Sequence, residues 1–146
     1  MYRTHTCGEL TTAAVGKEVM LSGWVHKRRD LGGLIFVDLR DRYGLTQVVF
    51  HPEMMKDLSV AESLKYEYVI RVKGKVVKRA ENTVNKELST GEIEIQASEV
   101  DILSQAKPMP FEIFETNKGE DDEELRLKYR FLELRREKLK NNILFR

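Results

Sequence analysis

The sequence predicts a mainly β domain, a small barrel of five strands with one inserted helix, followed by a helical C-terminal tail. Three observations support this prediction: short segments in which apolar and polar residues alternate, turns that contain glycine, and one segment with helical spacing after the third strand. The chain has 146 residues, 41% of them hydrophobic, which suffices for one domain of ordinary size with its own core.

Three strands are expected in the first third of the chain, over residues 19–26, 34–40 and 46–50. The turns between them are expected at 29–33 and 41–44, because their glycines adopt the positive φ that tight turns need. Before the first strand, a short helix is predicted from Thr11 or Thr12 to Gly16. These strands together are typical of a meander.

Over residues 52–64 the apolar residues recur at the spacing of a helix, and Pro52 suits its first turn. Two further strands are predicted over 68–79 and 93–103, separated by a polar loop. Three strands, a helix and two strands is the order of the OB-fold, a Greek-key barrel whose second and third strands and loops bind oligonucleotides.

Composition divides the chain into three parts. Residues 1–106 hold the predicted barrel, and residues 107–124 are proline-containing and then strongly acidic, as expected of a solvated linker or hinge. Residues 125–146 are basic and apolar with helical spacing, so we expect a helical tail there.

Several classes of protein are disfavoured. Cys7 is the single cysteine, and the three histidines are scattered, so neither an internal disulfide nor a metal site is expected. The longest apolar run, Leu34 to Val37, is far shorter than a membrane span, and the first residues lack the apolar region of a secretory signal. We therefore expect a soluble cytoplasmic protein without membrane contacts.

The formal net charge of +1 conceals blocks of opposite sign. Six basic residues and one acidic residue lie between Lys65 and Arg79, whereas six acidic residues and one basic residue lie between Glu81 and Asp101. Local basic surfaces attract polyanions, so these blocks are compatible with nucleic-acid binding. Charged solvated strand faces without a partner explain them equally well.

The strand over 34–40 has one apolar face and one mixed face, and the mixed face carries Phe36. The next strand carries Gln47, and a basic cluster, Lys27 to Arg29, precedes both. An aromatic ring can stack on a base, an amide can bond a base edge and guanidinium groups can hold phosphates, as single-stranded nucleic acid requires. Alternatively, Phe36 closes the barrel mouth and Gln47 is merely solvated.

Several motifs together resemble the N-terminal region of bacterial-type aspartyl-tRNA synthetases, a class II aminoacyl-tRNA synthetase family. They are Arg3 to Leu10, Gly23-Trp24-Val25, Arg28 to Arg42, Gly44 to Phe50, Thr90 to Glu94 and Arg126 to Arg136. The resemblance covers essentially the whole chain. Lysyl and asparaginyl relatives share parts of the pattern, but the Arg-Arg-Asp-Leu-Gly-Gly turn combined with Thr-Gly-Glu-Ile-Glu favours the aspartyl family.

The resemblance implies an anticodon-binding OB domain. It implies that Phe36 stacks on the central anticodon uracil and that Gln47 forms hydrogen bonds with this base. It further implies that Arg29 and Lys27 contact the anticodon loop. Arg79 and Glu94 would lie near the first anticodon base, where a carboxylate can accept hydrogen bonds from the N–H groups of guanine. It does not define roles for Asn82 and Thr83.

The same resemblance implies that 107–124 is a hinge and 125–146 the start of a class II catalytic domain. The motifs that bind ATP lie further along in the family, so this chain alone is expected to be non-catalytic, with no catalytic residue and no cofactor. The full-length ligase uses ATP and Mg²⁺ to attach aspartate to tRNA(Asp) and is expected to be a homodimer. A monomer is compatible with this chain alone, whose oligomeric state the sequence does not define.

Other readings remain open at this point. The chain could be a generic OB module for single-stranded nucleic acid, or the anticodon domain of a lysyl or asparaginyl relative. A nuclease built around Asp38, Asp41 and Arg40 is a further alternative, although acids and arginines in such a turn more often form ion pairs. Whether tRNA(Asn) is also a partner is not decided by the sequence.

Overall fold

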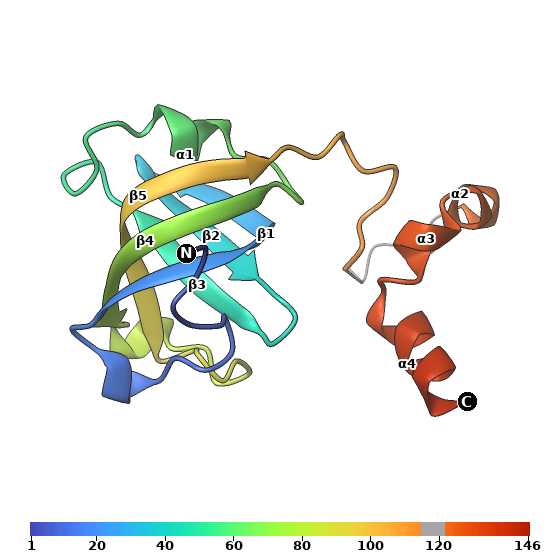
Figure 1. Cartoon of the computed structure of the whole chain (residues 1–146), viewed down its shortest axis with the longest axis horizontal. Helices are drawn as coiled ribbons and strands as arrows, with labels where there is room; N and C mark the ends of the chain where they lie inside the picture. Colours follow the sequence, from blue (N-terminus) through green and yellow to red (C-terminus); the bar gives the residue numbers. More distant parts are fainter. Residues whose placement is uncertain (115–121) are drawn as a thin grey trace. The chain divides into compact units, whose positions relative to one another are not determined.

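A computed structural model of the chain describes residues 1–114 and 122–146. The chain divides into two compact units, Met1–Ala106 and Lys107–Arg146. The first unit contains the five strands, and the described part of the second contains three short helices, as Figure 1 shows.

The first unit is a closed β-barrel, which confirms the predicted fold class. Its strands are β1 (Glu18–Leu31), β2 (Leu34–Arg40), β3 (Leu45–Phe50), β4 (Val69–Lys78) and β5 (Ile93–Ser104). They close in the order β1-β2-β3-β5-β4. The β3–β5 pair is parallel and the other neighbouring pairs are antiparallel.

Alternate residues of each strand fill the interior, because side chains of a β-strand point in turn to its two faces. In β2 the buried residues are Ile35, Val37 and Leu39, as the apolar face predicted. Phe50 of β3 is fully buried among them. The polar residues of β2 therefore lie on the outer surface of the barrel.

Strand β1 contains a β-bulge that the alternation did not predict. Val25 pairs with Leu39, but the next pair is Lys27 with Asp38, so His26 is the extra residue. The strand also continues through most of the predicted turn at 29–33 and ends at Leu31. The turn itself consists of Gly32 and Gly33, with φ of 65° and 89°.

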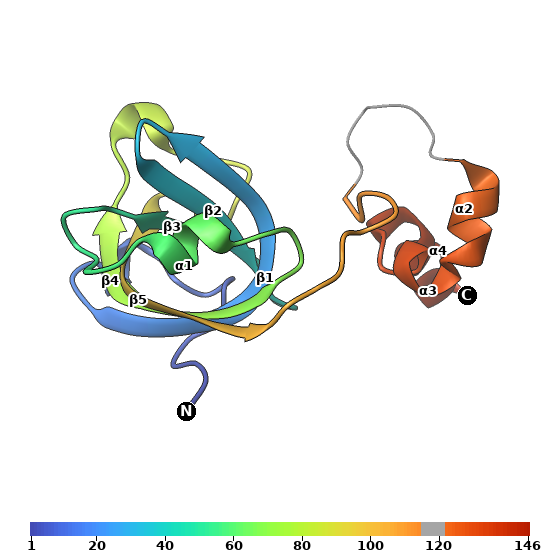
Figure 2. The same cartoon turned by 90° about the horizontal axis from the view of Figure 1, so that it is seen from above.

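Both helices predicted around the barrel strands are shorter than expected. Helix α1 spans only Ser59–Ser63, and the opening helix is one 3₁₀ turn, Thr12–Ala14. The residues before α1 form a separate turn, in which the His51 carbonyl accepts from the amides of Met54 and Met55. Helix α1 lies over one end of the barrel (Figure 1 and Figure 2) and buries Ala61 in the core.

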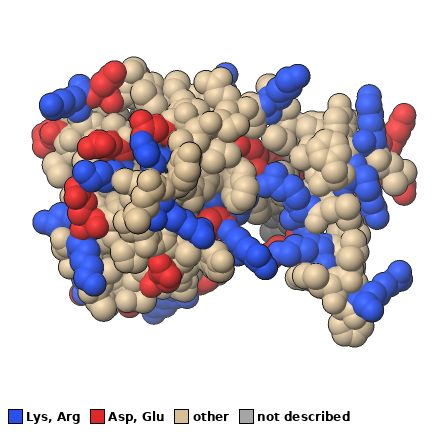
Figure 3. Space-filling model, in the orientation of Figure 1, with Lys and Arg blue, Asp and Glu red and all other residues tan. Residues whose placement is uncertain are grey.

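The two charge blocks of the sequence meet in the barrel, where some of their residues form ion pairs. Four residues of the basic block lie on β4 and three residues of the acidic block lie on β5, and these strands are neighbours. Arg71 is 2.7 Å from Asp101, and Lys73 is 3.7 Å from Glu99. Basic and acidic side chains are accordingly interspersed over the barrel face shown in Figure 3. Arg71 and Lys73 are therefore compensated by acidic side chains of the neighbouring strand.

The second unit has its own small apolar cluster. Its helices are α2 (Glu123–Lys128), α3 (Arg130–Glu133) and α4 (Glu137–Phe145). Phe111 and Ile113 pack with Leu132, and Arg136 donates to the Glu112 carbonyl at 2.6 Å. Part of the predicted acidic linker, residues 115–121, lies outside the described residues. None of the described helices is long and apolar enough to cross a membrane.

Gly74 marks a close approach of two strands and generates a test of the fold. A Cβ atom there would lie 2.3 Å from the Gln96 carbonyl oxygen on β5. Gly74→Ala is therefore expected to lower the free energy of unfolding by about 1–3 kcal/mol, the usual cost of adding atoms to a tightly packed site. Urea unfolding measures this, with exposed Lys75→Ala as the control, expected within about 0.5 kcal/mol of wild type. Equal stability of both variants would contradict the close approach.

Candidate nucleic-acid interface

Four polar residues on neighbouring strands form a line across the outer face of the barrel. They are Arg29 of β1, Asp38 of β2, Gln47 of β3 and Glu94 of β5, and we refer to them as the polar strip. Asp38 lies opposite Gln47 in the β2–β3 ladder. Because β3 pairs with β5, Gln47 and Glu94 are also neighbours. The strip thus joins residues that are up to 65 positions apart.

Hydrogen bonds connect the polar strip from end to end. Arg29 Nη2 is 3.3 Å from both Asp38 Oδ1 and Gln47 Oε1. Gln47 Nε2 donates to Glu94 Oε2 at 2.9 Å. The strip therefore contains groups that can donate to and accept from a nucleobase, held in defined positions.

Phe36 lies beside the strip on the outer face of β2. It pairs with Arg29 across the β1–β2 ladder, and the Arg29 Cζ atom lies 5.9 Å from its ring centroid. Its neighbours Ile35 and Val37 fill the interior, so Phe36 does not close the barrel mouth. Gln47 is only 8% exposed, so it is not a merely solvated side chain either.

Lys27 and Arg29 reach this face because of the bulge in β1. Residues 19, 21 and 25 point inward, and strict alternation would direct Lys27 and Arg29 inward as well. The extra residue His26 reverses the alternation, which places Lys27 opposite Asp38 on the outer face. Lys27 is exposed and therefore accessible to an anion.

Arg79 lies next to the strip but is itself buried, with 7% exposed. Its Nε donates to the Ile93 carbonyl at 2.9 Å, and its Nη1 donates to the Thr83 carbonyl at 3.4 Å. Burial lowers the pKa of the Arg79 guanidinium, whereas the carboxylates of Glu94 and Asp38 act in the opposite direction. Arg79 thus connects the end of β4 to the loop that follows it.

Sequence reasoning missed Asp38 as part of the site. Its place on the mixed face of the strand was visible in the sequence, but the sequence did not show that Asp38 lies within hydrogen-bond distance of Arg29 on the neighbouring strand. The structure shows what Asp38 does: its carboxylate accepts from the Arg29 guanidinium and so positions this group beside Phe36.

The residues of the nuclease alternative are all bonded to other groups. Arg40 donates to both carboxylate oxygens of Glu67, at 3.0 and 3.2 Å. Asp41 accepts from the backbone amides of Cys7, Tyr43 and Gly44. No group of three or more His, Cys, Asp or Glu residues that could hold a metal ion occurs in residues 1–114 and 122–146. The nuclease alternative therefore has no geometric support.

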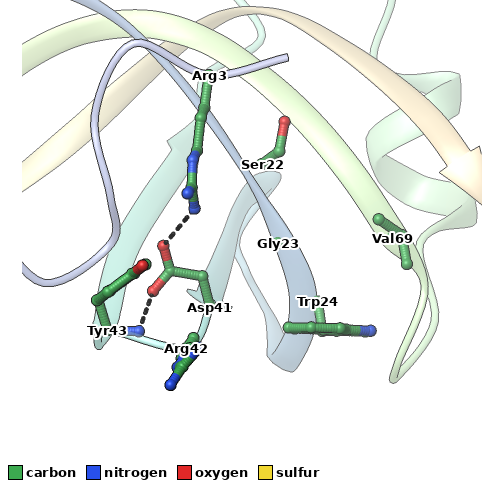
Figure 4. Close-up of a pocket in the computed structure, with 8 residues that line it drawn as sticks. All are labelled: Arg3, Ser22, Gly23, Trp24, Asp41, Arg42, Tyr43 and Val69. Carbon is green, nitrogen blue, oxygen red and sulfur yellow. Dashed lines mark hydrogen bonds and ion pairs between the residues drawn. The ribbon is translucent and has the colours of Figure 1, made fainter.

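A cavity of about 290 Å³ is lined by none of the polar-strip residues (Figure 4). The Asp41 carboxylate sits between Arg3 and the Tyr43 amide, and the Arg3 guanidinium lies 5.6 Å from the centre of the Tyr43 ring. These contacts tie the N-terminal segment to the β2–β3 turn. The lining residues are Arg3, Ser22, Gly23, Trp24, Asp41, Arg42, Tyr43 and Val69.

The outward position of Phe36 can be tested by stability alone. Phe36→Ala is expected to lower the free energy of unfolding by less than about 1 kcal/mol, the size of an exposed cation–π contact. Leu39→Ala, on the opposite face of the same strand, is expected to cost about 2–5 kcal/mol because it leaves a core cavity. Chemical denaturation of both variants provides the comparison. A cost for Phe36→Ala as large as that for Leu39→Ala would show that the ring belongs to the core.

Comparison with known proteins places the chain in a family. Residues 19–103 match the tRNA anti-codon model, described as an OB-fold nucleic acid binding domain. Over 145 residues the chain is 56% identical to an aspartate–tRNA ligase of Bacillus licheniformis, covering 99% of this chain and 24% of that protein. An aspartate–tRNA(Asp/Asn) ligase of Rubrobacter xylanophilus is 54% identical with the same coverage.

Solved structures show the same architecture. Asparaginyl-tRNA synthetase from Pyrococcus horikoshii matches with a TM-score of 0.74 and 26% identity, over 92% of this chain and 29% of that one. An OBody bound to hen egg-white lysozyme matches with a TM-score of 0.64 and 30% identity, over 74% of this chain and 95% of that one. The chain spans about a quarter of the length of the ligases that it resembles, and it belongs to the family of OB-fold nucleic acid binding domains of the tRNA anti-codon type.

Proposed function

We propose that this chain is the anticodon-binding region of an aspartate–tRNA ligase and that it binds the anticodon loop of tRNA(Asp). The observation that carries the proposal is the polar strip beside the outward-facing ring of Phe36. A stacking platform next to an amide and flanked by basic side chains matches the requirements of a single-stranded loop.

Each residue has a chemical role in the proposal. Phe36 stacks on the central anticodon base, and Gln47 bonds the edge of this base. Lys27 and Arg29 contact phosphates of the loop, because both lie on the outer face of β1. Glu94 and Arg79 lie at the far end of the strip, where Glu94 can accept from the N–H groups of guanine as the first anticodon base.

In the full-length enzyme we place this barrel, residues 1–106, before a hinge over 107–124 and the start of the catalytic domain at 125–146. The names of the relatives support a ligase that attaches aspartate to tRNA. ATP and Mg²⁺ would then bind in the catalytic domain, and the enzyme would act as a cytoplasmic homodimer. Because some relatives are named for both tRNA(Asp) and tRNA(Asn), discrimination between the two needs measurement.

The experiment that tests the proposal compares anticodon stem-loops of tRNA(Asp), tRNA(Asn) and tRNA(Lys) with an unrelated single strand, at one stated salt concentration. The proposal expects tighter binding of the tRNA(Asp) stem-loop than of the unrelated strand. Equal affinity for all of them would instead support a generic module for single-stranded nucleic acid. A preference for tRNA(Lys) or for tRNA(Asn) would support a lysyl or an asparaginyl relative.

Substitution of the two central residues should separate affinity from specificity. Phe36→Ala is expected to weaken binding to most loops by about 1–3 kcal/mol, because any base can stack on the ring. Gln47→Ala is expected mainly to reduce the preference for uracil over cytosine at the central position, by about 1–3 kcal/mol. Titrations with loops that differ in this base measure both effects. If neither variant changes affinity or preference, the binding face lies elsewhere.

The phosphate contacts should appear in the salt dependence. The logarithm of the association constant is expected to fall with the logarithm of salt concentration by roughly 0.7 per phosphate contact in a single strand. Arg29→Ala is expected to weaken all loops alike and to make this slope shallower. Arg71→Ala is a matched control, because Arg71 lies on β4 and is paired with Asp101. An unchanged slope in Arg29→Ala would remove Arg29 from the phosphate contacts.

A further inference from the structure

We propose that Glu94 is a positioning residue: it fixes the orientation of the Gln47 side-chain amide. In this orientation, Gln47 selects a uracil at the central anticodon position. The inference rests on the proposed function and deepens it. The structure carries it through three features: the partners of the Gln47 amide, its burial, and the place of Arg29 above Phe36.

The two partners of Gln47 leave one orientation of its side-chain amide. A guanidinium group can only donate hydrogen bonds, and a carboxylate can only accept them. Gln47 Oε1 therefore faces Arg29 and Nε2 faces Glu94. If the amide turned over, Oε1 would face the carboxylate and Nε2 would face the guanidinium. Since Gln47 is only 8% exposed, water would not compensate for these two repulsive contacts.

Arg29 occupies the place that a base would take. Its guanidinium lies 5.9 Å from the Phe36 ring centre and donates to Gln47 Oε1, which are the two contacts expected of a stacked base. Its side chain is 40% exposed, and its buried Nε has no hydrogen-bond partner among the described residues. Arg29 is thus the neighbour of Gln47 that can move aside, leaving an acceptor, Oε1, for the incoming base.

The order of donors and acceptors then decides which pyrimidine fits. Uracil presents its N3–H donor next to its O4 acceptor, so N3–H replaces the Arg29 donor at Oε1 and O4 accepts the remaining N–H of Nε2. Cytosine presents the reverse order, an N3 acceptor and an N4 amino donor. Its N3 would face Oε1, and its amino group would face Nε2. Only a turned-over amide would suit cytosine, and the Glu94 carboxylate opposes that orientation.

The test uses the whole chain with two anticodon stem-loops of tRNA(Asp) that differ only in the central base, uracil or cytosine. Wild type is expected to prefer uracil by about 5- to 150-fold, the range for a good bidentate base contact. Glu94→Gln is expected to bring this ratio close to 1, because a glutamine can both donate and accept and so tolerates either orientation of Gln47. Glu99→Gln is the matched control on β5 and is expected to keep the wild-type ratio.

Two further measurements separate positioning from a structural effect. In a Gln47→Ala background, Glu94→Gln is expected to leave the ratio unchanged, because Glu94 acts on the central base only through Gln47. A change of the ratio in that background would contradict the positioning role. Thermal unfolding checks that each variant is folded. If Glu94→Gln does not fold, Glu94→Ala takes its place, with the same expected loss of the uracil preference.

The outcomes distinguish this inference from the proposed function. If wild type binds the tRNA(Asp) stem-loop no better than an unrelated strand, the proposed function fails and this inference fails with it. If wild type prefers uracil and Glu94→Gln retains that preference, or changes only the preference at the first anticodon position, the positioning role is overturned while the proposed function stands.

Discussion

Closure of the barrel depends on β1, which forms backbone ladders with two different strands along its two halves. Its first half, from Glu18 to Trp24, pairs with β4, and its second half, from Trp24 to Leu31, pairs with β2. A strand with one partner would leave the sheet open and its edge groups unpaired. Because β1 joins β2 to β4 and so closes the barrel, each strand has one face toward the interior and one toward solvent. The polar strip can form only on the solvent-facing side.

The polar strip combines partial burial with exposure to an incoming ligand. Gln47 is nearly covered, whereas the Arg29 side chain is 40% exposed. Hydrogen bonds are stronger where water is excluded, and an unpaired polar group there is correspondingly unfavourable. The buried members are therefore held in place, while the exposed member can exchange its contacts. In the proposed function, such a surface would discriminate between ligands by hydrogen-bond pattern more than by shape.

Much of the fold could be predicted from the sequence because its signals are local. The alternation in β2 correctly separated Ile35, Val37 and Leu39 from Phe36. Gly32 and Gly33 adopt positive φ in the turn after β1, as expected, whereas Gly44 does not. The helix over 52–64 was overestimated, because apolar spacing does not reveal that the His51 carbonyl starts a separate turn. The ion pairs of Arg71 and Lys73 with acidic residues could not be predicted for a related reason: they depend on β4 lying beside β5, which is a property of the whole sheet. Asp38 was missed because its partner, Arg29, comes from another strand.

The bulge at His26 has a consequence for comparing and recombining relatives of this chain. Before the bulge, odd-numbered residues of β1 form the inner wall; after it, odd-numbered residues form the outer surface. The extra residue acts as a frame shift for side chains within one continuous strand. If a sequence alignment placed its gap one position away from His26, inner and outer residues would be exchanged in the second half of β1, which carries Lys27 and Arg29. A segment of β1 transplanted between homologues therefore keeps Lys27 and Arg29 on the outer surface only if it includes both the bulge and the second half of the strand.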